Sequence, residues 1–121
     1  MKEVLLVGAG GMVGSVMRML IIKSNIINSN FPINTFLVNI IGCFLVGILI
    51  KYSSELNKDL SNQINNFLII GFCGGFTTFS AFSVDSLNLF NENKILILMM
   101  YSLLSTVLGI FSCYLGMNII R

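Results

Sequence analysis

The sequence contains no histidine, no tryptophan, a single proline and only five acidic residues in 121 positions. Without histidine, the chain has no imidazole to ligate a metal ion or to act as the base of a familiar catalytic constellation. The few acids are scattered and form no candidate catalytic dyad: Glu3, Glu55, Asp59, Asp85 and Glu92. An enzyme is therefore the least expected class of function.

Charge is also scarce, because charged residues make up 10% of the chain while hydrophobic residues make up 55%. A soluble domain carries about 25% charged residues, so a mean hydropathy of +0.91 indicates a membrane protein. The net charge of +2 is too small and scattered to suggest nucleic-acid binding. The three cysteines, Cys43, Cys73 and Cys113, fall in separate apolar segments without a CxxC pair, which is typical of buried free thiols.

Four apolar segments are each long enough to cross a bilayer, since about 20 helical residues span the hydrocarbon core. The first begins Met1-Lys2-Glu3, without an excess of positive charge, and no small-x-small cleavage site follows it, so we expect it to be retained rather than removed as a signal peptide. Short connections are expected at 24–32, 53–65 and 91–94. The sequence predicts one all-α transmembrane domain, with both termini on one side and helices at about 4–22, 33–52, 66–90 and 95–120.

Basic residues divide unevenly between the two sides of this predicted bundle. The side with the termini would carry Lys2, Lys51, Lys58 and Arg121, and the other side would carry Lys23 and Lys94. Cytoplasmic loops are enriched in Lys and Arg, but so small a difference selects no orientation firmly. The chain could insert in both directions and pair antiparallel with itself, or keep a single topology. A bundle this small also encloses little interior, so a transport path is expected to need an oligomer.

The glycine-rich stretch VGAGGMVG near the N-terminus resembles a dinucleotide-binding motif only superficially. The third glycine of that motif would fall on Val13, and no strand–helix–strand pattern follows. Gly10 and Gly14 instead form a GxxxG pair, which lets a neighbouring helix approach closely. Gly71 and Gly75 repeat the spacing. We expect both pairs to serve helix packing.

Two polar side chains lie inside the first two predicted spans. The guanidinium of Arg18 either snorkels to the membrane interface or forms an aqueous vestibule that attracts anions. Asn39 lies one turn into the second span. Its amide either hydrogen-bonds a neighbouring helix or offers N–H donors to an anion without adding a fixed charge.

The stretch GFCGGFTTFSAFS, residues 71–83, is poor helix-forming sequence in the third span. Glycine costs about 1 kcal/mol relative to alanine in a helix and threonine is also below average, so we expect a break near Gly74–Thr78. A break leaves carbonyls unpaired on one side and N–H groups on the other, so it must be buried or line a cavity. Free carbonyls favour a small hard cation, and free N–H groups favour an anion. Thr77 and Thr78 are suited to cap the second half.

Beyond the expected break, Phe79 and Phe82 are three residues apart and share a helix face, with Ser80 and Ser83 on an adjacent stripe. Ordinary packing against lipid or protein explains such a pattern. The alternative is a lining for a small anion, because aromatic ring edges are positive and hydroxyls donate hydrogen bonds. Such a lining would hold the anion weakly enough to release it. The residues alone leave both interpretations open.

This combination of motifs resembles one family, the small dual-topology fluoride channels, or fluoride exporters, of bacteria. The resemblance covers nearly the whole chain and depends most on GFCGGFTTFSAFS, together with Gly10-Gly11-x-x-Gly14, Arg18, Thr35 and Asn39. It implies an antiparallel homodimer in the bacterial inner membrane with two pores along the subunit interface. The expected function is passive fluoride efflux that lowers cytoplasmic fluoride. The expected partners are fluoride, membrane lipid and a second copy of the chain.

The same resemblance implies roles for individual pore residues. Phe79 and Phe82 match phenylalanines that present ring edges to fluoride, and Asn39 matches the pore amide. Ser80 matches a hydroxyl near the ion path, and Arg18 matches a vestibule cation.

The resemblance also implies a structural sodium ion, Na⁺, which is not transported. The backbone carbonyls of Gly74 and Thr77 match those that hold it at the dimer centre, two from each chain. Asp85 lies where the family often has an acid, and either a helix-end charge or a role in ion entry would explain it. The polar residues of the fourth span do not align with the family's hydroxyl track and are left without a role: Tyr101, Ser102, Ser105, Thr106, Ser112 and Tyr114.

Two other functions account for part of the sequence. A small multidrug-type proton-coupled cation exporter has the same number of spans, but it needs a carboxylate deep in the membrane. The first span offers only Glu3, at its edge. A membrane subunit without transport activity would explain the GxxxG pairs but not the phenylalanine and hydroxyl stripes.

Overall fold

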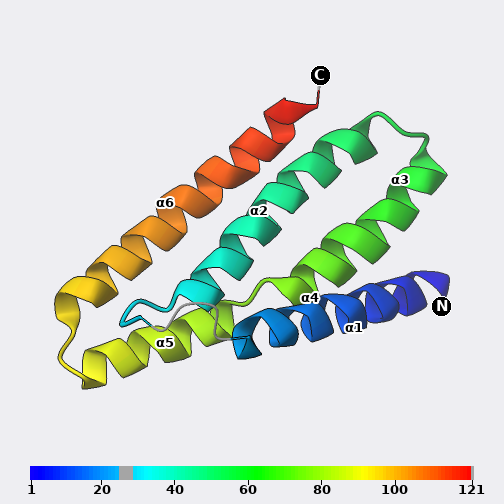
Figure 1. The fold of residues 1–121 in the computed structure, drawn as a ribbon. Helices are drawn as coiled ribbons and strands as arrows, with labels where there is room; N and C mark the ends of the chain where they lie inside the picture. Colours follow the sequence, from blue (N-terminus) through cyan, green and yellow to red (C-terminus); the bar gives the residue numbers. More distant parts are fainter. Residues whose placement is uncertain (25–28, 121) are drawn as a thin grey trace.

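The computed structural model describes residues 1–24 and 29–120, and its spans are helical (Figure 1). The elements are α1 (Lys2–Lys23), α2 (Ile33–Ser54), α3 (Lys58–Ile64), η1 (Asn65–Cys73), α4 (Gly74–Phe76), α5 (Phe79–Asn91) and α6 (Ile95–Ile119). Within the described residues, 4 helical stretches are long and apolar enough to cross a membrane, and α3 to α5 together make the third, Lys58–Asn91. The predicted all-α architecture is confirmed. Arg121, one of the cations counted above, and residues 25–28 of the first connection lie outside the described residues.

The two halves of the third span pack mainly against different helices. α2 packs along α6, and η1 and α4 pack on α1 (Figure 1). After α4 the helix is interrupted for two residues, and α5 then leads to the start of α6. The beginning of α1 and the end of α6 lie at the same end of the bundle (Figure 1). Only 11–22% of each span is buried, so most of the apolar surface is left for lipid or a partner subunit.

Glycines make the contact between α1 and the third span. A Cβ on Gly10 or on Gly14 would overlap backbone carbonyl oxygens of η1. On the facing helix, a Cβ on Gly71 would lie 3.1 Å from the Cα of Gly10, and one on Gly75 would also meet the α1 backbone. The two predicted GxxxG pairs therefore form one interface, which fixes the third span against α1.

The third span begins earlier than expected, because residues 58–64 are helical rather than part of the connection. The Asn57 side chain caps this start by accepting a hydrogen bond from the Leu60 N–H at 3.0 Å. From Asn65 to Cys73 the helix widens into a π-helix, and the N–H of Gly74 reaches the carbonyl of Ile69, five residues back. Nothing in the spacing of the apolar residues predicts this widening.

The turn between α5 and α6 is closed by an asparagine in the left-handed region. Asn93 has φ 57°, a conformation that asparagine tolerates better than most residues. The N–H of Lys94 bonds to the carbonyl of Leu89 at 2.9 Å, and that of Asn93 bonds to Phe90 at 3.0 Å. This is a Schellman motif, and it turns the chain sharply into α6.

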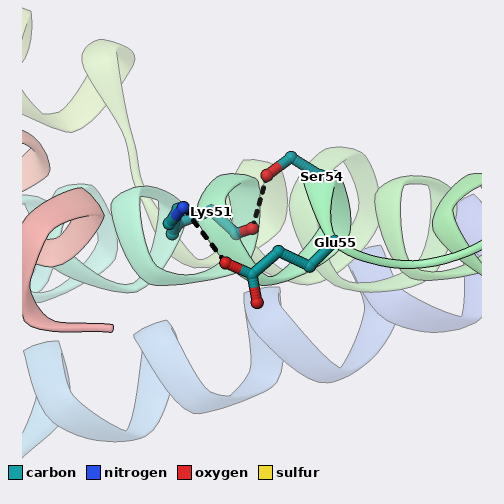
Figure 2. A network of polar contacts seen from close by, with 3 residues as sticks. All are labelled: Lys51, Ser54 and Glu55. Carbon is teal, nitrogen blue, oxygen red and sulfur yellow. Dashed lines mark hydrogen bonds and ion pairs between the residues drawn. The ribbon is translucent and has the colours of Figure 1, made fainter. Parts of the chain in front are cut away.

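The last turn of α2 carries a small polar network (Figure 2). Lys51 Nζ lies 3.0 Å from Glu55 Oε1, and the Ser54 hydroxyl donates to the Lys51 carbonyl at 2.7 Å. The two charged side chains are 38% and 48% exposed, so the pair contributes little to stability. Its position marks the point where the second span reaches water, close to the predicted end at residue 52.

Gly14→Ala is expected to lower the free energy of unfolding by about 1–3 kcal/mol, because the added methyl would press on the backbone of η1. Gly8→Ala is the matched control, since a Cβ there meets nothing within 4 Å. Thermal unfolding of the purified proteins in detergent compares the two. Equal stability of Gly14→Ala and the unaltered chain would contradict the packing role of this glycine.

Candidate functional site

The third span is interrupted at two threonines. α4 ends at Phe76 and α5 begins at Phe79. Between them the backbone is extended, with ψ 158° at Thr77 and ψ 118° at Thr78. The predicted break near Gly74–Thr78 is confirmed and lies at the C-terminal end of that range.

Only one of the two expected threonine caps is present. The Thr78 hydroxyl accepts a hydrogen bond from the Ala81 N–H at 3.1 Å and so caps α5. The Thr77 hydroxyl instead donates to the carbonyl of Cys73 at 2.8 Å. The two adjacent threonines therefore serve opposite halves of the span.

Asn39 of α2 holds the break by pairing with the backbone of Thr78 in both directions. The Thr78 N–H donates to Asn39 Oδ1 at 2.7 Å, and Asn39 Nδ2 donates to the Thr78 carbonyl at 3.1 Å. The amide thus replaces backbone partners that the interruption removes. An amide group has two N–H donors, and this pairing uses one, so the other remains for a further acceptor.

Arg18 of α1 satisfies a third backbone group at the break. Its Nε donates to the carbonyl of Gly75 at 2.9 Å. In a continuous helix that carbonyl would accept from the N–H of Phe79, which the break displaces. A guanidinium has five N–H donors, so Arg18 brings a positive charge to the interruption while part of its hydrogen-bonding capacity is still free.

Two carbonyls lose their helical donors without receiving a replacement of this kind. The N–H of Thr78, which would serve the Gly74 carbonyl in a continuous helix, donates to Asn39. The N–H of Ala81, which would serve the Thr77 carbonyl, donates to the Thr78 hydroxyl. Gly74 is exposed on the surface of the single chain. The described residues contain no cluster of three or more His, Cys, Asp or Glu, so carbonyl oxygens are the cation ligands that the break offers.

A groove of about 370 Å³ runs beside the break. The described residues that line it come from α2, the break, α5 and α6, and include no Asp, Glu, Lys or Arg. They are Asn39, Cys43, Val46, Thr77, Thr78, Phe79, Phe82, Ser105, Thr106 and Cys113. The groove therefore offers amide, hydroxyl, thiol and aromatic groups without a fixed charge.

The two phenylalanines lie next to each other at the start of α5. The ring centroids of Phe79 and Phe82 are 5.7 Å apart, with an interplanar angle of 31°. The ring of Phe82 also contacts that of Tyr101, with centroids 5.0 Å apart. Phe79 is 80% exposed, which is unusual for a residue so close to the middle of a span unless lipid or a partner covers it.

The structure brings together three of the predicted pore residues, Asn39, Phe79 and Phe82, in the lining of one groove. Ser80 is absent from that lining, and its hydroxyl lies 3.1 Å from the Thr78 hydroxyl. Arg18 approaches the break from the α1 side through Gly75.

Sequence reasoning missed the contribution of α6. Ser105 and Thr106 line the groove, and Ser105 Oγ is buried with no hydrogen-bond partner among the described residues. The hydroxyl of the fully buried Tyr101 donates a hydrogen bond to Asp85 Oδ2 at 3.3 Å. Asp85 therefore links α5 to α6 through this bond. The available signal was the four-residue spacing of Tyr101 and Ser105, which places them on one helix face.

Nearly the whole chain is similar to known proteins. A family described as "CrcB-like protein, Camphor Resistance (CrcB)" matches residues 5–117. Relatives from Azobacteroides pseudotrichonymphae, Flavobacterium psychrophilum and Phocaeicola vulgatus are 42%, 39% and 43% identical to it. The matches cover 96%, 100% and 96% of this chain and 94%, 98% and 96% of the respective relatives. Each of these relatives is named a fluoride-specific ion channel FluC.

Asn39→Ala is expected to destabilise the protein by about 1–3 kcal/mol, because it leaves the N–H and carbonyl of Thr78 unpaired in an apolar setting. The control is Asn118→Ala, since Asn118 is exposed and, among the described residues, its side chain bonds within its own helix, to the Tyr114 carbonyl at 2.7 Å. Thermal unfolding in detergent measures both variants. Asn39 would have no structural role at the break if the two variants unfolded at the same temperature.

Proposed function

The chain belongs to the CrcB-like protein family, a family of multi-pass integral membrane proteins, and on that premise we propose that it is a fluoride channel. Its full-length relatives are named fluoride-specific ion channels. The observation that carries the proposal is the uncharged groove beside the interrupted span, which Asn39, Phe79 and Phe82 all line.

A neutral lining suits the smallest halide for a physical reason. Fluoride must lose its water to enter a narrow path, so N–H donors, hydroxyls and positive ring edges must replace that water. A fixed positive charge at the same point would bind the anion too tightly for rapid release. The second N–H of Asn39 and the hydroxyl of Ser105 are the donors that the groove supplies, and Phe79 and Phe82 supply the ring edges. The Thr106 hydroxyl also lines the groove but donates to the Ser102 carbonyl at 2.9 Å.

Permeation through such a path is passive. Hydrogen fluoride enters an acidified cell as the neutral acid and ionises in the cytoplasm. A membrane potential that is negative inside then drives the anion outward with about 2.3 kcal/mol per 100 mV. In a bacterial inner membrane the channel lowers cytoplasmic fluoride without coupled transport.

The functional unit in this proposal is an antiparallel homodimer with two pores along its interface. The exposure of Phe79 and of Gly74 supports a partner that covers them. A second copy would also close the groove, which is open in one chain. The small difference in basic residues between the two sides is compatible with insertion in both directions.

The carbonyls of Gly74 and Thr77 fit a sodium site in this dimer. They lack helical donors, and unwound backbone carbonyls are suitable Na⁺ ligands. A two-fold axis at the break would bring the same pair from each chain together. The ion would hold the two breaks to each other and is not transported.

The multidrug-type proton-coupled exporter is not retained. Its mechanism needs a carboxylate that exchanges protons within the membrane, and the described residues that line the groove include neither Asp nor Glu.

Phe79→Ile and Phe82→Ile are each expected to reduce fluoride efflux from liposomes by at least about tenfold, which corresponds to ~1.4 kcal/mol in the barrier. Isoleucine keeps an apolar side chain but has no polarised ring edge. Phe111→Ile is the control, because Phe111 is 52% exposed on α6 and is absent from the groove lining. A fluoride electrode records the rates, and size-exclusion chromatography checks the assembly. Rates equal to those of Phe111→Ile in both variants would remove the phenylalanines from the pore.

Na⁺ is expected to stabilise the dimer against heat, with a midpoint that rises with Na⁺ concentration, since a ligand that binds only the folded state stabilises it by mass action. Thermal unfolding in detergent is compared in NaCl and in choline chloride at equal ionic strength. The sodium site would be refuted by the same midpoint in both salts over the whole concentration range.

A further inference from the structure

Two of the three cysteines face the groove from neighbouring helices. Cys43 of α2 and Cys113 of α6 both line it, and both are partly exposed. Cys73 is only 1% exposed and is absent from the lining. The thiols thus differ sharply in access, although nothing in their sequence spacing distinguishes them.

Glycines at the crossing of α2 and α6 bring the two accessible thiols together. A Cβ on Gly109 would lie 3.6 Å from Cys43 Sγ, and Gly109 is one turn before Cys113 on the same helix. A Cβ on Gly47, one turn after Cys43, would overlap the Cys113 carbonyl oxygen. Side chains one helical turn apart are about 5–6 Å from each other. The two cysteines therefore lie about one helical turn apart along one seam between α2 and α6, where both glycines leave the space without a side chain.

The surroundings of this thiol pair select the type of cation it would accept. The groove lining has no carboxylate and the chain has no histidine, so hard cations find no charged oxygen ligand. A structural zinc site takes four N or S ligands, more than the pair supplies. Soft cations such as Cu⁺, Ag⁺ and Hg²⁺ prefer thiolates and accept two of them in a near-linear arrangement.

We propose that Cys43 and Cys113 form a two-thiolate site for a soft metal cation inside the groove, and that a bound metal closes the ion path. Each thiol releases its proton to water as its sulfur forms a bond to the metal. For a divalent ion two S–H bonds are replaced by two S–metal bonds, two protons are released, and nothing is oxidised or reduced. The closure part of this inference rests on the proposed channel function, whereas the metal site does not.

Closure follows from where the bridge would lie. Cys43 is one turn from Asn39 along α2, and Cys113 shares the same groove with Ser105 and Thr106 of α6. A sulfur–metal–sulfur bridge across α2 and α6 would fill space beside the proposed fluoride donors. A monovalent cation held by two thiolates would in addition leave a net negative charge, which repels an anion.

The metal site is tested with Hg²⁺ on the purified protein in detergent, by counting free thiols and following the ultraviolet absorption of mercury–thiolate bonds. In Cys73→Ala, one Hg²⁺ per chain is expected to remove both remaining thiols and to resist a competing monothiol. Adding Cys43→Ala or Cys113→Ala is expected to abolish that resistance. The unaltered protein should lose the same two thiols while Cys73 stays unreacted, which guards against effects of the alanine at position 73. A requirement for two Hg²⁺ per chain, or equal resistance in the single-thiol variants, would overturn the site.

Closure is tested separately by fluoride efflux from liposomes, with each variant compared before and after addition of Hg²⁺. Efflux through Cys73→Ala is expected to fall at least about tenfold, equivalent to ~1.4 kcal/mol, and to recover with a dithiol. In the variant that lacks both Cys43 and Cys73, the efflux rate after Hg²⁺ is expected to equal that variant's own rate before Hg²⁺. Absence of efflux before Hg²⁺ is added would contradict the channel function and leave the thiol count to decide on the metal site. Undiminished efflux with both thiols consumed would overturn the closure.

Discussion

The pairing between Asn39 and Thr78 is the interaction on which the rest of the site depends. In hydrocarbon an unpaired backbone N–H or carbonyl costs several kcal/mol, so a span can be interrupted only where other groups replace the lost partners. Asn39 replaces two of them, with hydrogen bonds of 2.7 and 3.1 Å. Arg18 replaces a third at the Gly75 carbonyl. With these supports the chain keeps two extended residues in the middle of a transmembrane bundle.

The interruption has two consequences that together make the site. It turns the start of α5 so that Phe79 and Phe82 face a groove between α2 and α6. It leaves the carbonyls of Gly74 and Thr77 without their helical donors, because the N–H groups of Thr78 and Ala81 donate elsewhere. The one charged group that supports it, Arg18, approaches from the α1 side, and the described residues that line the groove carry no charge. The glycine interface between α1 and η1 matters for the same reason, because it holds Arg18 within reach of the break.

The sequence alone was enough to predict the number of spans, the place of the break and the cap at Thr78, because glycine and threonine act through local backbone preferences. The π-helix before the break packs closely against the α1 backbone, a contact between distant segments that local preferences do not contain. The bond from Arg18 to Gly75 was missed because its acceptor is a main-chain carbonyl far along the chain. Ser105 and Thr106 were indistinguishable from the other hydroxyls of α6 until α2 and α5 were placed beside them.

The most direct measurement is the efflux of fluoride from liposomes that contain the purified, unaltered protein, followed with an ion-selective electrode and repeated with chloride as the internal anion. A neutral path of amide, hydroxyl and ring-edge donors predicts rapid release of fluoride and retention of chloride. Release of both anions at similar rates, or retention of both, would contradict it.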